Sequence, residues 1–347
     1  MRVGRFSVVA FVAVAALAAA CADPSSSTTG STDGGLGTSS TSVESPTTDG
    51  SGAQHAFEAE HFAAGAIVGE VTTETCTLNG GTKTTCARFT IAGYPSTYAV
   101  GPFCPDTIAT PAEDAGIWFD GDGVYDLDGK FIANLADFYD DDQWRMFDSD
   151  GNVNVTDTPE AFDGAARPDV DPAYQDHCVE GRLEWLSGGV PVQTTVLIPL
   201  ESAKAASASS AHRGDLGVTL DGVVIAESAP VAAILGAHTI AAFDDCGGHY
   251  NPIAGYHLHG VMGCGHLEDE QVPGETAMFG FAMDGYPIHL PLDTTALATA
   301  GLDACNGHST PTVGYHYHAN SAAKNAVLPC LTGEYVATGR PGPPPRR

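Results

Sequence analysis

Basic residues are scarce in this chain. Its 347 residues include 14 Lys and Arg against 43 Asp and Glu, which gives a formal net charge of −29. Nucleic-acid binding requires a basic surface that neutralises phosphates, so this balance argues against a nucleic-acid partner. An acidic surface keeps a protein soluble and attracts divalent cations.

Familiar catalytic signatures are also missing. The sequence contains neither Gly-x-Ser-x-Gly nor His-Glu-x-x-His, so no common serine-nucleophile or zinc-protease motif is present. Beyond the first 21 residues, no apolar stretch is long enough to span a membrane. The chemistry of this protein therefore has to be sought in another pattern.

The N-terminus predicts export. Arg2 and Arg5 precede the short apolar stretch Val8–Ala20, which ends at Cys21. Small residues directly before a cysteine resemble a bacterial lipobox, so residues 1–21 predict a signal with Cys21 as the lipid-anchored end of a cell-envelope lipoprotein. Ordinary cleavage after Ala18-Ala19-Ala20, giving a secreted protein, is the alternative. Membrane contact is expected only through that anchor.

Composition divides the rest of the chain. Residues 22–54 are mostly Ser, Thr, Gly and Asp and predict a disordered linker. Residues 55–335 form the predicted folded domain. The Pro-rich residues 336–347 predict a disordered tail.

Eight cysteines remain when Cys21 is set aside, and an even number in an exported chain predicts disulfides. Cys76 and Cys86 flank Asn79-Gly80-Gly81, a hairpin turn signal, so a disulfide across that hairpin is expected. The other cysteines are Cys104, Cys178, Cys246, Cys264, Cys305 and Cys330.

Strand signals dominate the domain. Short runs rich in apolar and β-branched residues predict strands at 89–91, 117–119 and 192–200. The Ala/Ser-rich segment 203–211 predicts a short helix or a loop. The expected fold is mainly β, a disulfide-stabilised single domain.

Two acidic runs, at 120–129 and 140–152, alternate Asp with Gly, and such runs can wrap a Ca²⁺ ion with oxygen ligands. Neither run matches the EF-hand loop, so solvated Asp-Gly turns are the alternative to calcium.

One cassette occurs twice in the C-terminal half. The segments 244–249 and 303–308 both carry an Asp and a Cys-x-Gly-His sequence, and Tyr-His-x-His follows in each. Cys305 follows Cys246 by 59 residues, and His318 follows His259 by the same number. Upstream, 216–222 parallels 279–285. We predict an internal duplication with units at about 216–264 and 279–330.

Each unit is expected to form a strand, an Asp-Gly turn, a second strand, a loop, and a turn leading to the Tyr-His-x-His strand. Asp221 and Asp284 are interpreted as turn residues. Equivalent cysteine positions predict the pairs Cys246–Cys264 and Cys305–Cys330 rather than a Cys/His zinc site. If the units pack about a two-fold axis, their His strands would face one another.

The Tyr-His-x-His pattern suits a metal. Side chains of a strand alternate between its faces, so the two histidines of each pair share one face and can chelate one ion. Imidazole suits Zn²⁺ and Cu²⁺. The candidate ligands are His257, His259, His316, His318, His249 and His308.

Two further histidines and two aspartates are additional candidates for the metal site. His289 or His266 offers another imidazole, and Asp244 and Asp303 are candidate ligands or candidate partners that orient the imidazoles. The competing interpretation is a hydrogen-bonded histidine network inside a disulfide-rich core.

These motifs resemble the YHYH domain family of exported microbial proteins. The resemblance rests on 244–249, 255–259, 280–288, 303–308 and 314–318, with weaker similarity at 89–105 and 198–225. The first copy departs from the pattern, because Leu258 replaces the second tyrosine. The resemblance implies no defined activity.

Three functions follow from these residues. The first is an exported protein that binds Cu or Zn. The second is a metal-dependent or histidine-based hydrolytic enzyme, with His289, Asp244, Asp303 and Tyr256 as acid/base candidates. The third is a cell-surface structural or binding module without metal.

Overall fold

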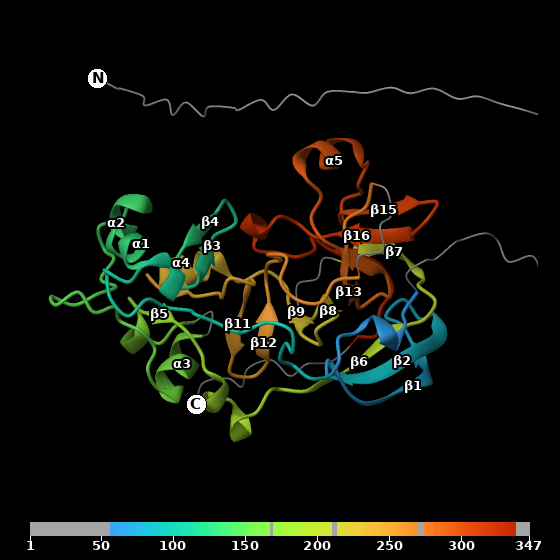
Figure 1. Ribbon diagram of the computed structural model, residues 1–347, viewed down its shortest axis with the longest axis horizontal. Helices are drawn as coiled ribbons and strands as arrows, with labels where there is room; N and C mark the ends of the chain where they lie inside the picture. The colour runs from blue at the N-terminus through green and yellow to red at the C-terminus, as the bar shows by residue number, and fades with distance from the viewer. Residues whose placement is uncertain (1–55, 167–168, 210–213, 269–273, 338–347) are drawn as a thin grey trace, which may run out of the picture. The chain divides into compact units, whose positions relative to one another are not determined.

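Short strands make up most of the computed structural model, which describes residues 56–166, 169–209, 214–268 and 274–337 (Figure 1). The predicted export signal and linker, and residues 338–347 of the tail, lie outside these ranges. The described residues all belong to one compact unit. None of the described helices is both long and apolar enough to cross a membrane.

An eight-stranded sheet, built from the yellow-to-red part of the chain in Figure 1, contains both Tyr-His-x-His segments. Its strand order is β11-β12-β9-β8-β13-β14-β16-β15. The bounds in that order are Gly248–Asn251, Gly255–Leu258, Val224–Ile225, Gly217–Thr219, Met278–Ala282, Pro287–His289, Gly314–His318 and Gly307–Thr310.

The pairing in this sheet is the same on both sides of the central antiparallel pair β8–β13. The β11–β12 hairpin pairs in parallel with β9, and the β15–β16 hairpin pairs in parallel with β14. Each half also inserts one short helix before its hairpin, α4 (Val231–Gly236) or α5 (Thr294–Thr299). The matched pairing agrees with the predicted duplication, which stays a prediction about the origin of the sequence.

The sheet order corrects one expectation. Strands β12 and β16 do not face one another, because β9, β8, β13 and β14 lie between them. The two His-x-His pairs therefore belong to two separate places rather than to one shared site. The reason is that the two units join edge to edge through β8 and β13, so their hairpins become the outer strands.

Smaller sheets complete the fold. A three-stranded sheet joins β1 (Ile67–Thr77), β2 (Lys83–Ile91) and β6 (Thr194–Pro199), and β3 (Ile117–Phe119) pairs with β4 (Val124–Asp126). The predicted strands at 89–91, 117–119 and 192–200 are confirmed by β2, β3 and β6. Strand β5 (Cys178–Val179) pairs with β10 (Ile240–Ala241). The remaining α-helices of the described residues are α1 (Gly129–Ala133), α2 (Leu135–Phe138) and α3 (Pro159–Ala165), and short 3-10 helices occur between the strands.

The prediction of a helix or loop at 203–211 was wrong. Residues Lys204–Ser209 form strand β7, which pairs with β17 (Leu331–Gly333). Ala and Ser have little β propensity, but pairing with a distant strand supplies backbone hydrogen bonds that a local pattern cannot reveal.

Four disulfides close the fold. Cys76–Cys86 spans the β1–β2 hairpin, and Cys246–Cys264 and Cys305–Cys330 are the pairs predicted from equivalent positions. The fourth pair is Cys104–Cys178. The loops of 246–264 and 305–330 each enclose all three histidines of one cassette, so each disulfide restricts the chain segment that carries them.

The acidic runs form turns and caps. Asp120 accepts hydrogen bonds from the backbone of Asp122 and Gly123, and Asp128 caps α1 by accepting from Phe131. Asp148 likewise accepts from the backbone of Asp150 and Asn152. Within the described ranges, these runs bring together no group of metal-ligating side chains. Asp120, Asp128 and Asp148 accept from backbone N–H groups of their own turns, so the calcium alternative receives no support.

Two tyrosines of β16 differ in what their hydroxyls bind. Tyr317 is fully buried, and its hydroxyl donates to Asp284 (2.6 Å), which is 0% exposed. Tyr315 donates to the exposed Asp303 (2.8 Å). A buried carboxylate that loses a donor cannot recover it from water, whereas an exposed one can.

We therefore expect Tyr317→Phe to lower the free energy of unfolding by about 1–3 kcal/mol, the usual cost of a buried group left unsatisfied. Tyr315→Phe serves as the matched control and should cost less than about 1 kcal/mol. Urea denaturation of both variants measures the difference. Equal losses would contradict the role assigned to the Tyr317–Asp284 bond.

Candidate metal centres

The Cys-x-Gly-His turn is organised by one aspartate in each cassette. Asp244 accepts hydrogen bonds from the backbone of Cys246 (3.1 Å) and Gly248 (3.0 Å), and Tyr256 donates its hydroxyl to the same side chain (2.7 Å). A side chain at Gly248 would collide with that hydroxyl, so the motif requires glycine there.

The second cassette repeats this arrangement. Asp303 accepts from the backbone of Cys305 (2.8 Å) and Gly307 (3.0 Å) and from the Tyr315 hydroxyl (2.8 Å). Neither aspartate contacts an imidazole through a hydrogen bond found among the described residues. The expectation that Asp244 and Asp303 are metal ligands or orient the imidazoles was therefore wrong: they hold the turn and the tyrosine.

The hairpins place a third histidine beside each pair. In β11–β12, His249 lies directly opposite His257, and in β15–β16, His308 lies directly opposite His316. Cross-strand partners have neighbouring side chains on one face of a sheet. Gly255 and Gly314 make the tight turns possible, since their φ angles of 73° and 81° are left-handed.

The tyrosines occupy the opposite face, as the alternation predicts. Tyr256 and Leu258 pack with Tyr250 in one hydrophobic cluster, and Tyr317 packs in the main core. The histidine face is consequently backed by a packed apolar layer, which fixes the position of both strands.

Two groups of potential ligand atoms result. The first cluster contains His249, His257 and His259, and the second contains Glu275, His308, His316 and His318; within each, the ligand atoms lie within 4.8 Å of one another. All six histidines proposed from the sequence therefore fall into these two clusters, three in each.

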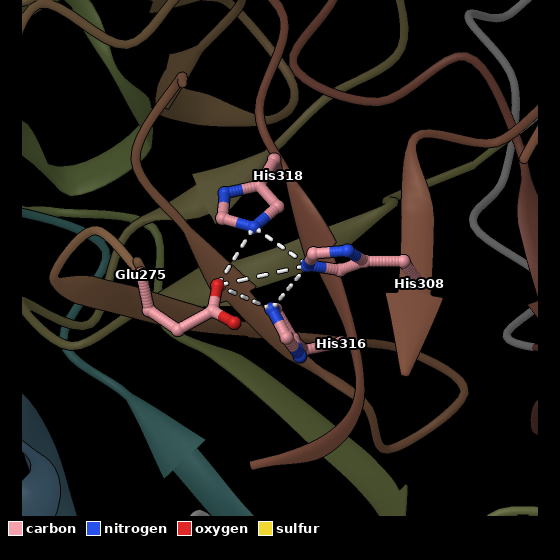
Figure 2. A group of neighbouring side chains, drawn as sticks. All are labelled: Glu275, His308, His316 and His318. Atoms are coloured by element: carbon pink, nitrogen blue, oxygen red, sulfur yellow. Dashed lines mark hydrogen bonds and ion pairs between the residues drawn. The ribbon is translucent and has the colours of Figure 1, made fainter. Parts of the chain in front are cut away.

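Glu275 brings the fourth ligand atom of the second cluster (Figure 2). Its Oε2 lies 3.0 Å from His316 Nε2, 3.2 Å from His318 Nε2 and 3.6 Å from His308 Nε2. His308 Nε2 lies 3.0 Å from His316 Nε2 and 3.2 Å from His318 Nε2. Four nitrogen or oxygen atoms bound tetrahedrally to zinc at about 2.0–2.1 Å lie about 3.3 Å apart, within the range of these separations.

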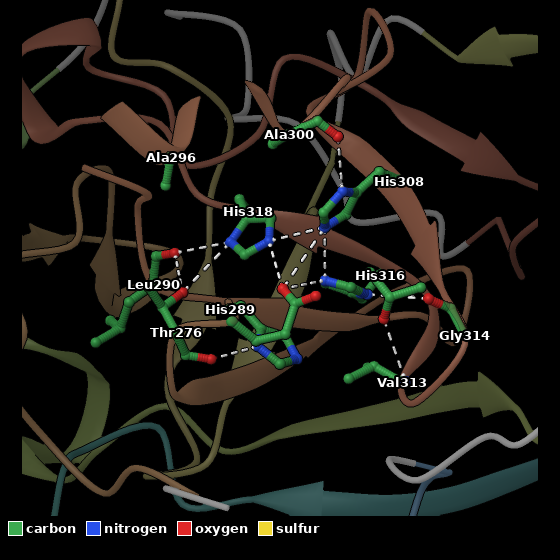
Figure 3. Close-up of polar contacts among 12 residues, drawn as sticks. Thr276, His289, Leu290, Ala296, Ala300, His308, Val313, Gly314, His316 and His318 are labelled. Atoms are coloured by element: carbon green, nitrogen blue, oxygen red, sulfur yellow. Dashed lines mark hydrogen bonds and ion pairs between the residues drawn. The ribbon is translucent and has the colours of Figure 1, made fainter. Parts of the chain in front are cut away.

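The second ring nitrogens are all directed at the backbone (Figure 3). Nδ1 of His308 lies 3.0 Å from the carbonyl oxygen of Ala300, and Nδ1 of His316 lies 3.0 Å from that of Gly314. Nδ1 of His318 lies 3.1 Å from the carbonyl oxygen of Leu290 and 3.3 Å from the hydroxyl of Thr276, which donates its own proton to that same carbonyl. A carbonyl oxygen only accepts, so each Nδ1 carries the proton and donates it.

This tautomer decides what the Nε2 atoms can do. A neutral imidazole protonated at Nδ1 has only a lone pair at Nε2. Three such lone pairs and a carboxylate oxygen then converge with no proton among them, an arrangement that is repulsive unless a cation lies between them. Donation of the second ring N–H to a backbone carbonyl is also the common arrangement for metal-binding histidines.

Burial favours the neutral form of four of the clustered rings. It lowers the pKa of His316 and lowers that of His318 to about 4, although hydrogen bonds and Glu275 act in the opposite direction. Burial likewise lowers the pKa of His249 and His259 well below the ordinary value, and the neighbouring His257 adds to the effect. Neutral imidazole is the form that binds metal.

The first cluster repeats part of this geometry. His257 Nε2 lies 2.9 Å from His259 Nε2, and His257 Nδ1 lies 3.0 Å from the carbonyl oxygen of Gly255. Nδ1 of His259 is buried and makes no hydrogen bond among the described residues, so the tautomer of this ring is not fixed in the way that the Gly255 carbonyl fixes that of His257. The Nε2 atoms of His257 and His259 face each other.

The other two candidate histidines have different positions. The His289 ring lies 4.6 Å from the His316 ring, and its Nδ1 donates to the carbonyl of Thr276 (2.5 Å), next to Glu275. His289 thus holds the segment that carries Glu275 rather than joining the ligand group. His266 bonds Glu268 (3.2 Å) and belongs to neither cluster, so it is not a ligand candidate.

Sequence reasoning missed Glu275. It lies 41 residues before His316 and 43 before His318, upstream of β13, and the repeat gives no signal for it. The pairing of β13 with β14 and of β14 with β16 brings that segment to the histidines.

Comparison with known families identifies one segment. Residues 195–299 match the family model described as YHYH protein, which confirms the resemblance over that range. The range includes the first cluster and Glu275 and ends before His308. Similarity at 89–105, 303–308 and 314–318 stays a prediction. No curated protein and no solved structure matched the chain.

Proposed function

We propose that this protein, whose residues 195–299 carry a YHYH domain, binds transition-metal ions in its two histidine clusters. The ions are Zn²⁺ or Cu²⁺. The observation that carries the proposal is the second cluster, where three histidines donate Nδ1–H to backbone carbonyls and turn Nε2 toward Glu275. Imidazole and carboxylate donors at these separations suit either ion.

Two features support binding over a metal-free network. A hydrogen-bonded network needs a donor at each contact, and the Nδ1 bonds leave the second cluster without one at its centre. The strands that carry the ligands are fixed by disulfides and by the tyrosine-aspartate bonds, so little ordering is required when an ion binds.

Elemental analysis tests the proposal on untagged protein purified without chelator. We expect up to two equivalents of Zn or Cu, and His257→Ala and His316→Ala should each lose the metal of one cluster. His177→Ala, which changes a histidine outside both clusters, should keep the full content. Removing the metal should lower the melting temperature, because an ion bound only to the folded state stabilises it.

A metal-free protein whose stability is the same with and without chelator would contradict the proposal. That result would instead favour the structural or binding module without metal, in which the histidines serve the fold.

We also propose that the protein is exported and held at the cell envelope by a lipid on Cys21. Four disulfides fit an oxidising compartment, and the small residues before Cys21 fit lipoprotein processing. Mass spectrometry of the mature chain should find a diacylglyceryl group on an N-terminal Cys21. Cys21→Ala should remove the lipid, and an unlipidated wild-type chain in the medium would contradict the anchor and favour secretion.

A further inference from the structure

Thr276 follows Glu275 directly in the chain and also contacts a second ligand of the same cluster (Figure 3). Its hydroxyl donates to the carbonyl oxygen of Leu290 (2.6 Å) and lies 3.3 Å from Nδ1 of His318. The same carbonyl accepts the Nδ1–H of His318 (3.1 Å). The ring proton of His318 therefore lies between two oxygen atoms. The Thr276 hydroxyl is one of these atoms and is hydrogen-bonded to the other.

The main chain of Thr276 is held as well. Its carbonyl accepts the Nδ1–H of His289 (2.5 Å), and His289 lies opposite His318 in the pairing of β14 with β16. Side chain and main chain of Thr276 are thus bonded to His289 and Leu290, two consecutive residues at the end of β14. These two bonds fix the backbone from which the Glu275 side chain extends.

Glu275 needs such an anchor because it lies outside the sheet. It precedes β13 by three residues, yet its side chain is 5% exposed and its Oε2 lies near Nε2 of three histidines. A glutamate side chain has several rotatable bonds, and holding it in one position costs conformational entropy. A backbone that is already fixed leaves less to be ordered when an ion binds.

The first unit differs at the position of this anchor. His289 follows Ala226 by 63 residues, the offset that also relates the upstream strands of the two units. An alanine side chain has no polar atom and cannot donate a hydrogen bond. The imidazole that holds Thr276 therefore occurs in the unit whose cluster includes Glu275.

Resting on the proposed function, we infer that Thr276 is a positioning residue of the second cluster, which couples the Glu275 carboxylate to His318 and thereby sets the affinity of this cluster for its ion. His289 supports it by fixing the Thr276 carbonyl. Both residues act through the ligands. Removal of a partner that orients a metal ligand typically weakens metal binding about 10–100-fold.

Zinc titration of the full chain tests this inference in a His257→Ala background, which leaves only the second cluster intact. There, Thr276→Val removes the hydroxyl but keeps the shape of the side chain, and it should weaken zinc binding about 10–100-fold. Thr276→Ser keeps the hydroxyl and should bind zinc as tightly as the threonine does. Co²⁺ reports its coordination through visible absorption, so the spectrum of cobalt-loaded Thr276→Val should change and that of Thr276→Ser should not.

A matched background separates positioning from a general loss of stability. In His316→Ala, which leaves only the first cluster intact, Thr276→Val should leave the zinc affinity unchanged. Equal weakening in both backgrounds would overturn the inference. So would unchanged zinc affinity of Thr276→Val in the His257→Ala background, or a Thr276→Ser variant that binds as weakly as Thr276→Val. Failure of the wild type to take up zinc or cobalt would instead overturn the proposed function itself.

His289 provides a second arm that does not depend on the folding of the Thr276 variants. In the His257→Ala background, His289→Ala introduces the residue found in the first unit and should weaken zinc binding by a similar factor. His289→Asn offers an amide N–H near the position of Nδ1 and should restore part of the affinity. Unchanged zinc affinity in His289→Ala would overturn the role assigned to the bond between His289 and Thr276.

Discussion

The donation of a ring N–H to a backbone carbonyl is the interaction on which the candidate site depends. Gly314, Leu290 and Ala300 each accept from one histidine of the second cluster. These bonds fix both the tautomer and the rotation of each ring. Without them, the same histidines could donate to one another and form an ordinary buried network. With them, the Nε2 lone pairs and Glu275 converge on one point.

The rest of the fold holds those carbonyls and rings in place. Leu290 follows β14, Gly314 begins β16, and Ala300 follows α5, so three separate elements must meet for the cluster to form. The parallel pairing of β14 with β16 joins two of them, and the Cys305–Cys330 disulfide limits the motion of the hairpin. The aspartate-tyrosine bonds anchor the opposite face of the same strands. The histidine cluster and the tyrosines that pack in the core therefore lie on opposite faces of the same edge strands.

Local patterns in the sequence were enough to predict several parts of this arrangement. The period of a strand placed His316 and His318 on one face, and the equivalent cysteine positions in the two cassettes predicted the Cys246–Cys264 and Cys305–Cys330 pairs. The strand–turn–strand order of each unit also follows from local signals. All of these depend on residues that are close in the chain or related by the repeat.

What could not be predicted depends on distant contacts. The repeat does not specify whether its units join face to face or edge to edge, so the separation of the two clusters required the β8–β13 pairing. Glu275 reaches its histidines only through the assembled sheet. Asp244 and Asp303 carry carboxylates that could bind a metal. Those carboxylates instead accept hydrogen bonds from backbone N–H groups in their own turns. The Ala/Ser-rich composition of β7 does not predict a strand, and the segment forms one because it pairs with the distant β17.

The most direct measurement of the central claim is an anomalous-diffraction map of crystals grown with zinc, recorded at the zinc absorption edge. We expect a peak about 2.0–2.2 Å from Nε2 of His308, His316 and His318 and from an oxygen of Glu275. Histidine rings that instead present Nδ1 to the centre, or a zinc-saturated crystal without a peak there, would contradict it.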